Sequence, residues 1–71
     1  MTIHYKHHRI LDPTISTLAD GTGYTVFNVD IAREVGTATE VKSIWVAGKF
    51  STREAARNAA IASAVRFINN Q

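Results

Sequence analysis

The C-terminal stretch 50–68 constrains the fold most, because it predicts a single long helix. From residue 52 onward the stretch contains neither glycine nor proline, and alanine, the best helix former, dominates it. Ser51 and Glu54 fit a capping box, in which the Ser51 hydroxyl accepts a hydrogen bond from the Glu54 backbone N–H. We predict a helix that begins after Ser51 and ends near Asn69.

One broad face of this helix is apolar when successive residues are placed 100° apart. Its members are Ala56, Ala60, Ile61, Ala64, Val65, Phe67 and Ile68. The alanines allow close approach to another layer, and the larger residues fill the wider end. A helix with one apolar face needs a layer to cover, so we expect the upstream chain to form a sheet.

The upstream chain carries the alternation typical of strands. The candidate strands are 1–11, 24–31 and 40–47. Pro13 ends the first of them, and 14–18 can resume extended structure. Residues 19–23 form a turn by composition, and Gly36 marks a hairpin connection. We predict one α+β domain over residues 1–71, with a three-stranded antiparallel sheet covered on one face by the C-terminal helix.

The alternation also assigns faces to the sheet. The core face of the central strand is expected to carry Phe27, Val29 and Ile31, joined by Ile44 and Val46. The open face, away from the helix, would then carry Tyr24, Val26 and Trp45. A register slip of one residue in 40–47 would exchange Trp45 for Ile44 and Val46, so Trp45 can also be a core residue.

Length and composition limit the classes of protein to which this chain can belong. Seventy-one residues make one domain, and the absence of cysteine excludes disulfides and thiolate zinc sites. Eight basic and six acidic residues give a net charge of +2, which permits but does not require a polyanionic partner. No apolar run is long enough to span a membrane, and the N-terminus lacks the apolar segment of a signal peptide. We therefore expect a cytoplasmic protein without membrane partners.

No residue pattern indicates catalysis, a metal or a cofactor. His4 and His8 share one face of a strand while His7 points away, and two ligands do not close a zinc site. The motif Asp20-Gly21-Thr22-Gly23 resembles the active-site triplet of aspartic proteases, but a turn explains it better. Because no nucleophile elbow or paired carboxylates occur, we expect a protein that is not an enzyme.

Basic residues cluster where the helix begins. Lys49, Arg53 and Arg57 lie near its free N–H groups, where a phosphate can bind. The structural alternative is that Arg57 extends over the sheet edge and Arg53 pairs with a carboxylate of a strand. Lys6, Arg9 and Lys42 are further candidates on the sheet, although Asp30 would share the open face and repel phosphate.

Several segments resemble known families. The segments Tyr5-Lys6-His7-His8-Arg9-Ile10, Gly23-Tyr24-Thr25-Val26 and Phe50-Ser51-Thr52-Arg53-Glu54-Ala55-Ala56 together resemble a group of small uncharacterised proteobacterial β-β-β-α proteins, a likeness that implies a fold but no function. The junction at 48–55 is similar to the arm-binding domains of phage integrases and to plant AP2 domains. The stretch 53–60 is similar to the last helix of double-stranded RNA-binding domains, whose first helix has no counterpart here.

These observations favour a small binding module that contacts a protein partner, or a second copy of itself, through the open sheet face or an unpaired sheet edge. The alternative is nucleic-acid binding through the basic start of the helix and the sheet.

Overall fold

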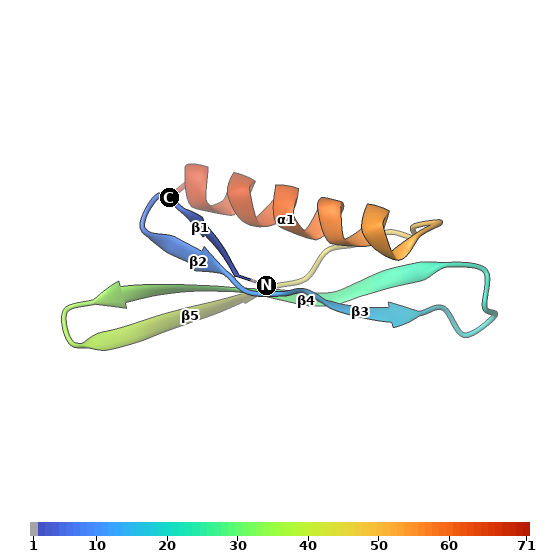
Figure 1. The fold of residues 1–71 in the computed structure, drawn as a ribbon, viewed down its shortest axis with the longest axis horizontal. Coiled ribbons are helices and arrows are strands. Elements are labelled where there is room, and N and C mark those ends of the chain that lie inside the picture. Colours follow the sequence, from blue (N-terminus) through green and yellow to red (C-terminus); the bar gives the residue numbers. More distant parts are fainter. Residues whose placement is uncertain (1) are drawn as a thin grey trace.

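The computed structural model describes residues 2–71 and shows an α+β fold with an antiparallel sheet and one C-terminal helix (Figure 1). The elements are β1 (Ile3–Tyr5), β2 (His8–Ile10), β3 (Thr14–Thr17), β4 (Tyr24–Val35), β5 (Ala38–Ile44) and α1 (Arg53–Asn69). The long β4 is the central strand. Both β2 and β3 pair with one of its edges, β5 pairs with the other edge, and β1 adds outside β2. The helix runs along one side of the sheet only.

The sheet has five strands, so the prediction of three was wrong in this detail. The segment 1–11 is a hairpin rather than one strand, and it turns at Lys6 and His7, whose φ angles are 47° and 65°. Such left-handed turn positions normally hold glycine or asparagine, and their absence concealed the hairpin. The turn is held from outside, because the Asn69 side chain of α1 accepts hydrogen bonds from the Tyr5 hydroxyl at 3.1 Å and the Lys6 ammonium at 2.7 Å.

A bulge in β4 changes which side chains face the helix. Thr14 pairs with Asn28 while the next residue, Ile15, pairs with Val26, so Phe27 is the extra residue. Strand alternation shifts by one at this point. Val26 and Val29 are therefore both buried against the helix, at 1% and 0% exposure, whereas Phe27 is 67% exposed. The expected core position of Phe27 and open-face position of Val26 were both wrong for this reason.

The helix packs on the sheet through a narrow stripe of small side chains. Ala56, Ala60 and Ala64 are fully buried, and Ile68 closes the stripe at 6% exposure. The larger residues of the predicted apolar face, Ile61, Val65 and Phe67, are only partly buried. Because alanine methyl groups are short, the helix can lie close to β4 along most of its length.

The helix begins one residue later than the capping box indicated. Thr52 is the N-cap, and its hydroxyl accepts a hydrogen bond from the Ala55 N–H at 3.0 Å. Before it, Phe50 and Tyr24 exchange backbone hydrogen bonds of 2.8 and 2.9 Å, which fasten the incoming chain to the start of β4. This bridge places the first turn of α1 over the sheet.

Candidate interaction surface

The face of the sheet opposite the helix, called the open face below, carries most of the exposed large apolar residues. Phe27, Val41 and Trp45 are 67%, 55% and 73% exposed. Val41 pairs with Ala32 on this face. Trp45 follows Ser43 by two positions, and because Ser43 bonds Asp30 on this face, alternation directs Trp45 to the same side.

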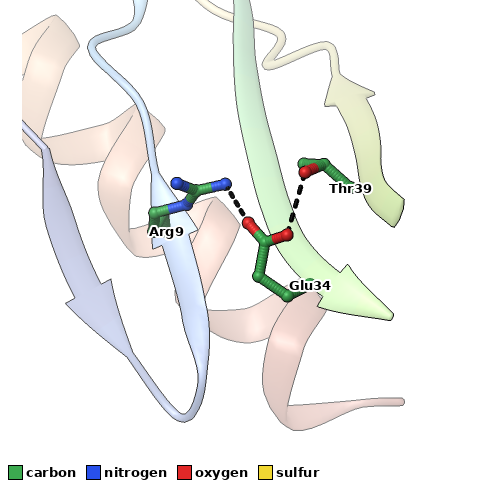
Figure 2. Close-up of polar contacts among 3 residues, drawn as sticks. All are labelled: Arg9, Glu34 and Thr39. Atoms are coloured by element: carbon green, nitrogen blue, oxygen red, sulfur yellow. Dashed lines mark hydrogen bonds and ion pairs between the residues drawn. The ribbon is translucent and has the colours of Figure 1, made fainter. Parts of the chain in front are cut away.

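Two polar networks lie on the open face beside these residues. Near the β4–β5 hairpin, Glu34 accepts hydrogen bonds from Arg9 at 2.7 Å and from the Thr39 hydroxyl at 2.9 Å (Figure 2). In the middle of the sheet, Asp30 accepts hydrogen bonds from the Asn28 amide at 3.0 Å and from the Ser43 hydroxyl. These contacts fix the side chains and give the open face an excess of carboxylate over cationic groups.

Tyr24, Val26 and Trp45, which the sequence placed together on the open face, lie on different faces of the sheet. Trp45 lies on the open face, which is one of the two positions that alternation had left open, and Val46 is buried on the helix side. Tyr24 and Val26 lie on the helix side instead, because the bulge at Phe27 shifts the alternation. Phe27 is the open-face residue that the sequence reasoning missed. No pattern within residues 24–31 marks this exchange, because the bulge is defined only by the pairing with β3.

The basic residues of the alternative site are largely engaged. Arg57 forms an ion pair with Asp12 at 3.5 Å, so it does not contribute a free charge. The Arg53 guanidinium stacks over the Tyr24 ring at 5.3 Å, rather than pairing with a carboxylate. Among residues 2–71, Lys49 and Arg53 remain as the exposed cations at the start of the helix.

The cations of the sheet do not form a cluster with them. Arg9 is paired with Glu34, and Lys6 is bonded to Asn69 at the opposite end of the helix. Lys42 pairs with Ile31, which puts it on the helix side of the sheet rather than on the open face. The expectation that Lys6, Arg9 and Lys42 share the open face was therefore wrong for Lys42.

Within residues 2–71, the histidines near the N-terminus contact different neighbours and not one another. His8 donates from Nδ1 to the Lys6 carbonyl oxygen at 2.7 Å, which helps to hold the left-handed turn, and its Nε2 is buried without a partner. His4 lies opposite Arg9. Across residues 2–71, no three histidine or acidic side chains come together as a metal site.

The described part of the chain has no surface pocket. Its single helix is neither long nor apolar enough to cross a bilayer. No protein-family model, no curated protein and no solved structure matches this chain. The resemblances of its sequence motifs to known families therefore stay predictions.

Proposed function

We propose that this protein is a small binding module without catalytic activity, and that it contacts a protein partner through the open face. The observation that carries the proposal is the exposure of Phe27 and Trp45 on one face, at 67% and 73%. Aromatic side chains are enriched in the buried centres of protein interfaces, where tryptophan is a frequent hot spot. Hydration of two such side chains is costly, and a partner would remove that cost.

The charges of the open face favour a particular kind of partner. Asp30 and Glu34 are carboxylates. Within residues 2–71, Glu34 is bonded to the cation Arg9, whereas Asp30 is bonded to the neutral donors Asn28 and Ser43. A complementary surface would be apolar at its centre and would carry lysine, arginine or amide donors at its rim. This also argues against a nucleic-acid backbone on the open face, because phosphates would meet carboxylates there.

Substitution of the two aromatic residues tests the proposal. A partner recovered with the wild-type protein should be purified and titrated by calorimetry against Trp45→Thr and Phe27→Thr. Each variant should raise the dissociation constant by at least about tenfold, as expected for truncated hot-spot residues. Val35→Thr is the matched control, because Val35 is also exposed, at 49%, but lies at the tip of the hairpin. If Trp45→Thr and Phe27→Thr bind the partner as tightly as Val35→Thr and the wild type do, the proposal is wrong.

Nucleic-acid binding is the second candidate, and one observation favours it. Lys49 and Arg53 are both exposed beside the first turn of α1, where the helix dipole attracts anions. A gel shift at low salt with duplex DNA, duplex RNA and single strands tests it, and Lys49→Glu with Arg53→Glu should remove any salt-sensitive complex. The absence of a complex with the wild-type protein would exclude this function.

A further inference from the structure

The outer edge of β5 is an unpaired strand edge. A two-residue turn joins β4 to β5, so Val35 and Ala38 form a hydrogen-bonded pair, and pairs alternate from there between bonded and non-bonded. The Asp30 carbonyl fits this pattern. It accepts from the Leu11 N–H at 2.9 Å and therefore points away from its β5 neighbour.

The alternation identifies which backbone groups are free. Thr39, Val41 and Ser43 occupy the non-bonded positions opposite β4, so their N–H and C=O groups point to the outer edge. No strand within residues 2–71 pairs with that edge. An exposed strand edge of seven residues is a template for another strand.

We propose that a second copy of this chain binds this edge, β5 against β5, in an antiparallel pair centred on Val41. This inference goes beyond the proposed function, because it uses the unpaired edge of the sheet rather than the open face. Val41 would lie opposite Val41 of the second copy, and Thr39 opposite Ser43 in both directions. In each of these pairs, the outward-pointing N–H and C=O groups of one copy meet those of the other copy, and together they complete the hydrogen-bond ladder.

The side chains of β5 are self-complementary in this register. Glu40 lies opposite Lys42 of the second copy, and by symmetry Lys42 lies opposite Glu40, so two cross-strand ion pairs form. Both residues point to the helix side of the sheet, because their β4 neighbours are Arg33 and Ile31. Within residues 2–71, Glu40 has Arg33 as a partner at 3.2 Å, and Lys42 has no ion pair. The second copy supplies the missing carboxylate.

Neighbouring registers lack this match. A two-fold axis at Glu40 sets two glutamates opposite each other, and an axis at Lys42 sets two lysines opposite each other. Like charges directly opposite on adjacent strands are destabilising. Of the registers that join outward-pointing backbone groups near the middle of β5, only the one centred on Val41 pairs opposite charges.

The pairing would enlarge the proposed binding surface. An antiparallel pair related by an axis perpendicular to the sheet keeps both helices on one side and both open faces on the other. The two Val41 side chains would meet on the open face, between the Trp45 residues of the two copies. The result is one continuous sheet with a doubled aromatic surface.

Sedimentation velocity over a wide concentration range tests the dimer. The wild-type protein should shift from its 7.8 kDa monomer toward twice that mass at high concentration, since one strand edge is a small interface. Amide exchange at Thr39, Val41 and Ser43 should slow at high concentration, whereas the Glu40 and Lys42 amides, bonded to β4, should not change. A wild-type protein that stays monomeric up to about 1 mM, where weak interfaces still associate, would overturn the inference.

Charge exchange tests the register and does not depend on one variant folding well. Lys42→Glu alone and Glu40→Lys alone should each weaken the dimer by about tenfold or more, because both ion pairs become repulsive. Mixing these two variants should restore dimers, and so should the double variant Glu40→Lys with Lys42→Glu. Failure of both restorations would overturn the register.

A backbone variant separates the edge from the open face. Val41→Pro removes an outward N–H but no bond to β4, so it should abolish the dimer while the monomer remains folded. Trp45→Thr should leave the dimer intact. If Trp45→Thr abolishes the dimer and Val41→Pro does not, the inference is wrong while binding through the open face still stands. If Trp45→Thr leaves both the dimer and partner affinity unchanged, the proposed function fails and the β5 pairing stands.

Discussion

The alanine stripe of α1 sets how closely the helix approaches the sheet, and Ala60→Leu tests this most directly. Ala60 lies in the middle of the stripe and is 0% exposed, with Ala56 and Ala64 buried on either side. Leucine adds three carbon atoms at a position where the helix faces β4. Because close-packed interiors have no spare volume for them, the helix must lift away or the side chain must leave its preferred rotamer.

The expected fall in melting temperature follows from the cost of overpacking and from the small size of the domain. Overpacking of this kind costs about 1–3 kcal/mol. A domain of 71 residues has a total free energy of unfolding of roughly 4–10 kcal/mol. Each kcal/mol lowers the melting temperature of a domain this small by about 4–8 °C, so Ala60→Leu should lower it by about 10 °C.

Thermal melting followed by far-UV circular dichroism measures this effect, with urea unfolding as a second measure. Ala62→Leu is the matched control, because Ala62 lies on the same helix, is exposed, and undergoes the same change in helix propensity. The control should melt within a few degrees of the wild type, on the scale of ordinary surface substitutions. Equal melting temperatures for the two variants would refute the close approach of α1 to the sheet.

Three further predictions concern turns. His7→Gly should raise the free energy of unfolding by about 0.5–1 kcal/mol in urea, since glycine adopts the φ of 65° without strain. Gly23→Ala should lower the melting temperature, because its Cβ would lie 2.6 Å from the Phe50 carbonyl oxygen. The Thr22 hydroxyl and backbone N–H lower the pKa of Asp20, so its stabilising effect is present above the ordinary aspartate pKa and lost as pH falls through the lowered one. When unfolding is measured as the pH is lowered, the Asp20→Asn variant should not show this loss of stability.

Much of the fold could be predicted from local patterns. The run of alanines without glycine or proline predicted α1. Alternation predicted residues 24–31 of β4 and 40–44 of β5, whereas the structure extends both strands toward the turn at Gly36. Gly36 predicted the hairpin between these strands, and it adopts a φ of 63°. Each of these signals lies within one element, where helix or strand periodicity alone determines which side chains share a face.

Features that depend on two elements could be seen only in the tertiary structure. The turn at Lys6 and His7 lacks the usual turn residues and is held by Asn69, some sixty positions away in the chain. The bulge at Phe27 exists only relative to its partner strand β3, so no property of β4 alone marks where its alternation shifts. The free edge likewise belongs to β5 because β2 and β3 occupy the other edge of β4. The sequence by itself determined the helix, the central strand and the hairpin that joins it to β5. Their partners decided which faces are buried and which edge is open, because a strand's inward side and its unpaired groups are defined only by what packs and pairs beside it.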